Sequence, residues 1–141
     1  MSLQNRLRVG VIGCGYWGSK HVRALLSLEA VAKVAVIEPN ADRSDAITRT
    51  FPGVESYPSL DAALPHIDAV VIATPPSTHA PLALQAIAHG KHVMVEKPLS
   101  VTTVEGRAMV DAARAAGVTL MVGHTFEYHA AVWSLRDLVQ N

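Results

Sequence analysis

The chain has 141 residues, of which half are apolar and 17% are charged, the composition of a globular domain that can bury a core. Its 12 Lys and Arg balance its 12 Asp and Glu, which argues against nucleic acid or an anionic membrane surface as a partner. The single cysteine excludes an internal disulfide framework, and no apolar run reaches the roughly 20 residues that span a bilayer.

The N-terminal residues 1–8 carry neither a long apolar core nor a small-residue cleavage site. They do not read as a signal peptide, and a cytoplasmic protein is expected. From there, short runs rich in Val and Ile alternate with segments of helical periodicity, which is typical of strands buried on both faces of a parallel sheet. The predicted strands are residues 9–12, 34–37, 69–73, 92–95 and 118–122, with a weaker edge strand at 54–57.

The intervening segments carry helix signals. Thr102 and Glu105 form a capping box, and Gly117 closes the helix that it opens. Gly90 ends an earlier helix, and a short helix is expected at residues 60–64. Apolar residues at helical spacing mark the longer helices: Val22, Leu25 and Leu26; Ala83 and Ile87; Met109, Val110 and Ala113; and Val132, Leu135 and Val139 in a final helix over residues 127–139. The sequence therefore predicts one α/β domain over residues 1–141, a doubly wound parallel sheet of Rossmann type.

The strongest local signal is the pattern G-x-G-x-x-G at residues 13–18, which follows the first strand and opens a helix. Gly13 permits a tight turn, Gly15 lets the backbone approach a pyrophosphate, and Gly18 lets the helix pack closely on the strand. The N–H groups at the helix N-terminus attract phosphates. In this context the pattern predicts dinucleotide binding, whereas alone it would also fit an ordinary glycine-rich turn.

Glu38 ends the second strand, 20 residues after Gly18. A carboxylate there accepts hydrogen bonds from the adenosine ribose and repels a 2′-phosphate, which favours NAD over NADP. Arg43 keeps NADP open, because an arginine nearby could accommodate the extra phosphate. The alternatives are a solvated glutamate at a strand end and an arginine on a solvated helix face.

Two further groups follow strands at the edge where doubly wound sheets bind ligands. Thr74 and Pro75 end the strand at 69–73 and predict either a cofactor-facing loop or a rigid turn, and His79 either contacts the nicotinamide side or caps that turn. Glu96 and Lys97 end the next strand, where charged groups are costly unless they face a cleft or a polar ligand. Lys97 could polarise a substrate oxygen and Glu96 could hold a ribose hydroxyl; the alternative is a surface salt bridge.

With these residues assembled, the chain resembles the Gfo/Idh/MocA family of oxidoreductases, which includes glucose–fructose oxidoreductase and inositol dehydrogenase. The resemblance rests on residues 11–18, 74–79, 90–98 and 122–126. It implies oxidation or reduction of a carbon–oxygen bond of a sugar, an inositol or a similar compound, with NAD as cofactor and NADP as the less favoured choice. No metal site is predicted.

The resemblance also implies roles for individual residues. Glu38 would hold the adenosine ribose, His124 would lie on the substrate side, and Lys97 would be the catalytic candidate. Pro98 would follow a cis peptide bond. The remaining positions divide between the pyrophosphate (Gly13, Gly15, Tyr16, Trp17, Gly18), the wall of the cofactor cleft (Thr74, Pro75, His79) and the nicotinamide ribose (Glu96, beside Lys97). The Tyr16–Trp17 pair resembles that of members that act on nucleotide sugars.

Complete members of the family have a second, mostly antiparallel domain, which supplies a catalytic histidine, substrate contacts and usually the oligomer interface. The chain ends at Asn141, so the resemblance implies a truncated cofactor domain that is inactive alone. The alternative is a non-catalytic NAD-binding module that regulates or binds partners through the helix at residues 127–139, with Trp133 and Leu135 exposed. That helix could equally pack its apolar stripe against the sheet.

Overall fold

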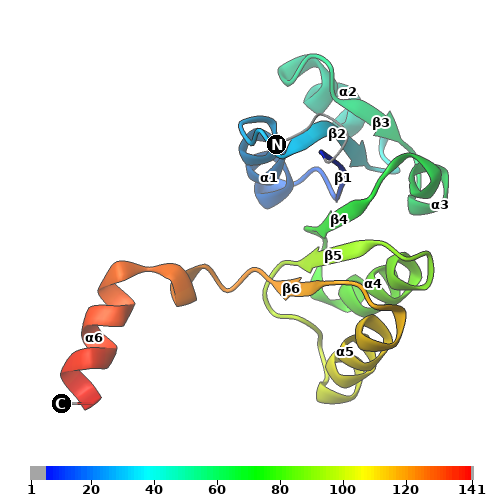
Figure 1. The fold of residues 1–141 in the computed structure, drawn as a ribbon. Helices are drawn as coiled ribbons and strands as arrows, with labels where there is room; N and C mark the ends of the chain where they lie inside the picture. Colours follow the sequence, from blue (N-terminus) through cyan, green and yellow to red (C-terminus); the bar gives the residue numbers. More distant parts are fainter. Residues whose placement is uncertain (1–5, 141) are drawn as a thin grey trace.

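Six parallel strands form the sheet at the centre of the computed structural model, which describes residues 6–140 (Figure 1). The sheet has the order β3-β2-β1-β4-β5-β6, with a crossover from one half to the other between β3 and β4. This is the doubly wound Rossmann order, so the predicted fold class is confirmed. The strands are β1 (Leu7–Ile12), β2 (Val31–Ile37), β3 (Glu55–Tyr57), β4 (Ala69–Ile72), β5 (His92–Val95) and β6 (Leu120–Val122).

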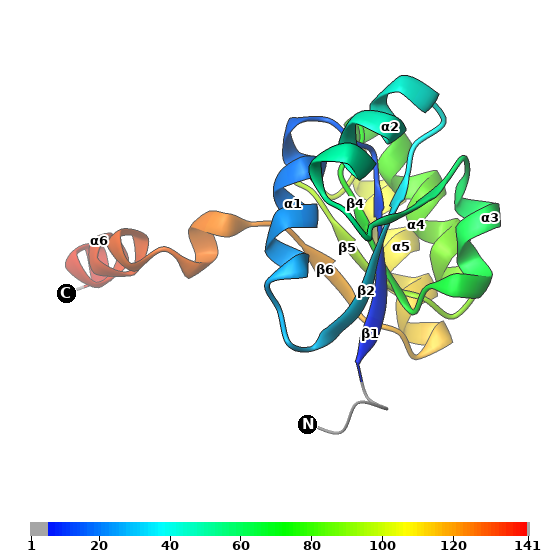
Figure 2. The same cartoon turned by 90° about the horizontal axis from the view of Figure 1, so that it is seen from above.

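Helices cover both faces of this sheet (Figure 2). The covering helices are α1 (Tyr16–Leu26), α2 (Ala41–Thr50), α3 (Leu60–Ala63), α4 (His79–Ala88) and α5 (Thr103–Ala116). A further helix, α6 (Ala130–Gln140), lies beyond the sheet, and 3-10 turns occur at Leu64–His66, Pro76–Thr78 and Thr125–Tyr128. No helix within residues 6–140 is long and apolar enough to cross a membrane. The ends of the predicted domain, residues 1–5 and Asn141, lie outside the described residues.

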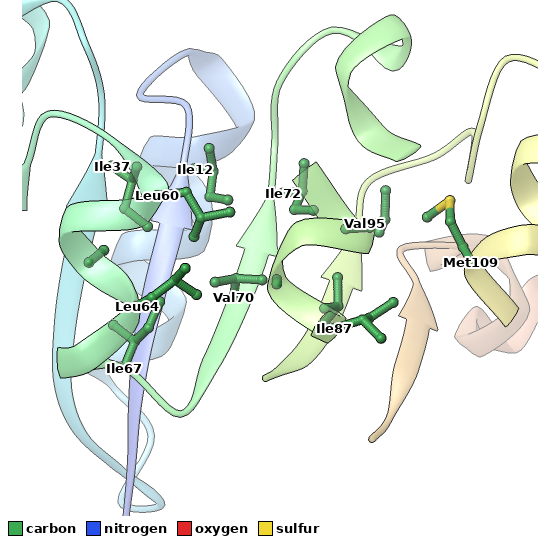
Figure 3. Close-up of a cluster of buried hydrophobic side chains, with 14 of the residues drawn as sticks. Ile12, Ile37, Leu60, Leu64, Ile67, Val70, Ile72, Ile87, Val95 and Met109 are labelled. Atoms are coloured by element: carbon green, nitrogen blue, oxygen red, sulfur yellow. The ribbon is translucent and has the colours of Figure 1, made fainter. Parts of the chain in front are cut away.

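The core consists of two layers because alternate residues of each strand point to opposite faces. On one face, Val9 and Val11 of β1 pack with Val22 of α1 and Ile47 of α2. On the other face, residues of β1, β2, β4 and β5 meet α3, α4 and α5 (Figure 3). The labelled members of this second cluster are Ile12, Ile37, Leu60, Leu64, Ile67, Val70, Ile72, Ile87, Val95 and Met109. The two clusters fix the sheet rigidly, and with it the positions at which the strands end.

The structure shortens one predicted strand. The strand expected at residues 118–122 begins only at Leu120, because the chain is still completing the end of α5 at Val118. Gly117 closes α5 with a φ of 67°, and the Val118 N–H donates to the carbonyl oxygen of Ala113. The predicted strand at 69–73 likewise ends at Ile72.

The final helix differs from the prediction in start and in packing. It begins at Ala130, after the 3-10 turn Thr125–Tyr128, rather than at residue 127. The His129 carbonyl oxygen accepts the N–H groups of Val132 and Trp133, which marks the first helical turn. None of the described residues of α6 is buried, and the helix extends away from the sheet (Figure 1). The alternative in which its apolar stripe packs on the sheet is therefore wrong.

Candidate functional site

The polar residues singled out in the sequence gather at one edge of the sheet. All six strands are parallel, so the segments that follow them leave from the same edge. Backbone hydrogen bonds hold these segments in register: the Gly13 N–H donates to Ile37 O at 3.0 Å, the Ala73 N–H to Ile12 O at 2.9 Å and the Glu96 N–H to Ile72 O at 2.9 Å. The edge therefore brings together residues as far apart in the sequence as Gly13 and Glu96.

The glycine turn has the geometry that its spacing predicts. Gly13 has a φ of 91°, and a Cβ there would lie 2.9 Å from the carbonyl oxygen of Ala73. A Cβ on Gly18 would overlap the Gly13 carbonyl oxygen, so α1 starts in direct backbone contact with the turn. At Gly15, by contrast, no described atom lies within 4 Å of a Cβ position. The space beside Gly15 is open to a ligand.

The first turn of α1 borders this open space. Gly15 is its N-cap, and no side chain in the described chain caps the helix. No acidic residue lies in the first turn either. The N–H groups at this end, together with the helix dipole, form a site that favours an anion such as a diphosphate.

Glu38 lies directly beside the turn and is 6% exposed. Its Oε2 accepts the N–H of Cys14 at 3.0 Å, and its Oε1 accepts the N–H of Asn40 at 3.1 Å. A carboxylate offers about four acceptor positions, so these two bonds orient the group and leave acceptor capacity for a ligand diol. The alternative of a merely solvated glutamate is wrong.

Cys14 lies in the same turn, and its thiol is partly buried. Burial, reinforced by the negative charge of Glu38, raises the pKa of its thiol to about 11, although Arg43 lowers it. The thiolate is the reactive form of cysteine, so this thiol remains protonated and unreactive near neutral pH.

Two adjoining cavities lie along the edge. One, of about 250 Å³, is lined by the glycine turn, Glu38, Arg43 and Thr74. The other, of about 420 Å³, is mainly apolar and is lined on both sides by prolines and aliphatic side chains, with Asp61 and Gln85 among its polar members. Both cavities include Thr74 and Pro75 in their walls. One cavity borders the helix N-terminus and the Glu38 carboxylate and the other is mainly apolar, so together they suit a ligand with a polar part beside a flat apolar part.

His79 lies beneath this wall rather than in it. The side chain is 1% exposed, and its two ring nitrogens lie 2.9 Å from the carbonyl oxygens of Thr74 and Pro98. Of the two alternatives in the sequence, the structure favours the one in which the histidine braces the turn. His79 thus ties the loop after β4 to the loop after β5. The peptide bond between Lys97 and Pro98 is cis, as the resemblance implied.

Glu96 has a side-chain partner, His21, that the sequence reasoning missed. Its Oε1 lies 2.7 Å from Nε2 of His21, and its Oε2 accepts the backbone N–H of Lys97 at 3.2 Å. The alternative of a surface salt bridge is therefore wrong for Glu96, which is only 8% exposed and is paired with His21 of α1. The available signal was the position of His21, three residues after Gly18 and therefore on the face of α1 that meets the sheet.

The remaining candidates surround the open side of the edge. Tyr16 and Trp17 are exposed and their rings meet edge to face. The Lys97 ammonium lies 5.8 Å above the Trp17 ring, so the predicted catalytic lysine and the start of α1 are neighbours. His124 is exposed and follows β6 at the same edge.

An open parallel sheet, a glycine turn at a helix N-terminus and a buried acid after the next strand together define a dinucleotide-binding domain of the Rossmann class. Comparison with known families agrees: residues 7–124 match the Gfo/Idh/MocA model, described as an oxidoreductase family with an NAD-binding Rossmann fold. The chain belongs to this family. Its predicted membership and its predicted class of cofactor are thereby confirmed.

Similar proteins with known activities are dehydrogenases and reductases. The chain is 35% identical over 131 residues to UDP-N-acetylglucosamine 3-dehydrogenase of Acidithiobacillus ferrooxidans, covering 93% of the chain and 41% of that protein. It is 38% identical over 142 residues to inositol 2-dehydrogenase of Burkholderia multivorans, covering 96% and 42%. The chain thus spans about two fifths of the length of these relatives.

Solved structures that resemble this chain also include proteins with a bound nicotinamide cofactor. A 3-ketoreductase from Actinomadura kijaniata in complex with NADP and TDP-benzene matches with a TM-score of 0.88 at 30% identity, covering 96% of this chain and 42% of that one. A protein from gentamicin A biosynthesis in complex with NAD matches with a TM-score of 0.85 at 35% identity, covering 92% and 38%. Relatives of this fold thus include complexes with either cofactor.

Proposed function

We propose that this chain is the NAD(H)-binding part of a dehydrogenase that oxidises a hydroxyl group of a sugar, an inositol or a nucleotide sugar. The observation that supports this most directly is the pairing of an open space at Gly15 with the oriented carboxylate of Glu38. In this proposal the α1 N-terminus binds the diphosphate and Glu38 accepts the adenosine ribose hydroxyls. The apolar cavity behind Pro75 receives the adenine.

In this proposal the residues that follow β5 contact the reacting half of the cofactor and the substrate. Glu96 accepts a hydroxyl of the nicotinamide ribose, and Lys97 donates to the substrate oxygen and stabilises the negative charge that develops there. NAD supplies the hydride acceptor when bound. His124 lies on the substrate side. A partner for Lys97 in proton transfer, further substrate contacts and an oligomer interface would come from residues outside this sequence, so the chain alone is expected to bind cofactor without turnover.

The choice of NAD over NADP rests on Glu38, because its buried negative charge would lie against a 2′-phosphate. Fluorescence titration with NADH and NADPH tests it on the wild type and on Glu38→Gln. The wild type is expected to bind NADH at least about tenfold more tightly than NADPH. Glu38→Gln is expected to bring the two affinities closer together. Equal affinities of the wild type for the two cofactors would contradict the proposal.

A second candidate function is a non-catalytic NAD-binding module. The observation that favours it is α6, which presents Trp133, Leu135 and Leu138 to solvent. These side chains would then bind a partner protein. If the full-length protein oxidises a sugar or a polyol, the dehydrogenase hypothesis is supported. If the full-length protein binds NADH without turnover, the hypothesis of a non-catalytic module is supported.

A further inference from the structure

The contact between His21 and Glu96 joins two parts of the site that the sequence leaves separate. His21 lies on α1, one turn after the glycine turn, whereas Glu96 follows β5. The 2.7 Å contact is largely shielded from water, with side-chain exposures of 19% for His21 and 11% for Glu96.

The surroundings hold the Glu96 carboxylate from three sides. One oxygen meets His21, and the other accepts the backbone N–H of Lys97. On the β6 side, a Cβ at Gly123 would lie 3.4 Å from Oε2, so this side is closed by backbone. A buried carboxylate without partners is costly, and His21 is the side chain that offsets this cost here.

The position of His21 is itself fixed. Helix α1 is locked to the turn by the close contact between Gly18 and the Gly13 carbonyl, and Val22 beside His21 is fully buried against the sheet. The imidazole is therefore presented to Glu96 from a rigid frame. The N-terminus of the same helix is the predicted diphosphate site. Helix α1 therefore sets the distance between the diphosphate site and the contact of His21 with Glu96.

We propose that His21 is the positioning residue for the nicotinamide half of the cofactor. His21 orients the Glu96 carboxylate toward the nicotinamide ribose, and the carboxylate in turn holds the backbone N–H of Lys97. The inference rests on the proposed function and deepens it. The proposed adenosine half instead uses Glu38, which follows β2, and the glycine turn, and the Glu38 carboxylate bonds to that turn and not to His21.

Three ligands separate the two halves: ADP carries the adenosine half alone, ADP-ribose adds the second ribose, and NADH adds the nicotinamide. Replacement His21→Leu removes the donor and is expected to weaken ADP-ribose and NADH binding by about tenfold while ADP binding stays within about twofold. Replacement His21→Gln restores an N–H donor near the position of Nε2 and is expected to recover most of the affinity. His89→Leu, at the exposed C-terminal end of α4 near the start of β5, is the matched control and should bind all three ligands as the wild type does.

Equal weakening for all three ligands in His21→Leu, or no weakening for any, would overturn the inference. A wild type that binds neither ADP nor NADH would instead contradict the proposed function. If His21→Leu does not fold, NMR on the wild type gives the same contrast: the His21 imidazole resonances should shift with ADP-ribose and not with ADP. Identical responses to the two ligands would overturn the inference.

Discussion

At the scale of single residues, the three glycines of the turn act in three different ways. Gly13 supplies a backbone conformation with positive φ, Gly18 makes room for a backbone contact, and Gly15 borders open space. Only the last of these roles concerns a ligand rather than the fold. Stability and binding should therefore separate when the glycines are replaced.

Gly15→Ala is expected to leave the melting temperature nearly unchanged, because the residue has a φ of −75° and its Cβ would meet no described atom within 4 Å. The new methyl group would nonetheless stand where the diphosphate approaches, and NADH binding should weaken roughly tenfold or more. Calorimetric titration and thermal unfolding measure the two effects.

Gly18→Ala is expected to do the reverse. Its methyl group would overlap the Gly13 carbonyl oxygen, and the free energy of unfolding should fall by about 3 kcal/mol in a urea titration. If both replacements lowered stability equally, the assignment of separate roles to Gly15 and Gly18 would be wrong.

The spacing of the glycines predicts the geometry of the turn well, because that geometry depends on residues close together in the sequence. His21 could not be assigned in the same way, since its partner Glu96 lies 75 positions further along the chain. The sequence does not predict the brace formed by His79 for a similar reason: its two partners are carbonyl oxygens of two loops that meet only in the folded sheet.

At the scale of elements, a helix cap and an ion pair at a strand end stabilise the fold around the sheet. Helix α5 opens with the predicted capping box: Thr102 Oγ1 accepts the Glu105 N–H at 3.2 Å, and Glu105 Oε2 accepts the Thr102 N–H at 3.0 Å. Thr102→Ala is expected to lower the free energy of unfolding by about 1 kcal/mol, measured in urea. Thr103→Ala changes the exposed neighbour and should be close to neutral; equal losses in both variants would contradict the capping role.

At the opposite edge of the sheet, Arg8 at the start of β1 donates from Nη2 to Asp68 Oδ1 at 2.7 Å and from Nε to Oδ2 at 3.0 Å. The Arg8 hydrogen bond lowers the pKa of the Asp68 carboxyl from its usual value. Because the folded-state pKa is depressed, the stabilisation is present above the unfolded-state value of about 4 and is lost as pH falls through the folded-state value.

Asp68→Asn is therefore expected to lower the melting temperature at pH 7 by no more than about 5 °C, and the difference from wild type should vanish well below pH 4. Differential scanning calorimetry across this pH range measures it. Asp111→Asn, at an exposed carboxylate 3.9 Å from Arg114, is the control and should show a smaller effect. A difference that persisted unchanged to pH 2 would contradict the ion pair as its source.

At the scale of the whole molecule, the alternation of buried strands and helices was sufficient to predict the sheet and its parallel direction. The final helix was predicted from its apolar stripe, but its packing was not, because a stripe indicates that a helix has an apolar face and not what that face contacts. None of the described residues of α6 is buried, and Leu135 and Leu138 are exposed to solvent.

Removal of residues 130–141 should therefore change the free energy of unfolding by less than about 0.5 kcal/mol. It should leave NADH affinity unaltered, because the residues of the proposed cofactor site lie in segments before α6. Urea unfolding and NADH titration of the shortened chain check both statements. A large loss of stability would show that α6 packs on the sheet in solution.

The central claim is that the carboxyl edge of this sheet binds a nicotinamide dinucleotide. Isothermal titration calorimetry of NADH into the folded 141-residue chain tests it most directly. The account predicts saturable binding of one NADH per chain, competed by ADP. A folded chain that produced no binding heat at any temperature tested, and no change in NADH fluorescence, would contradict it.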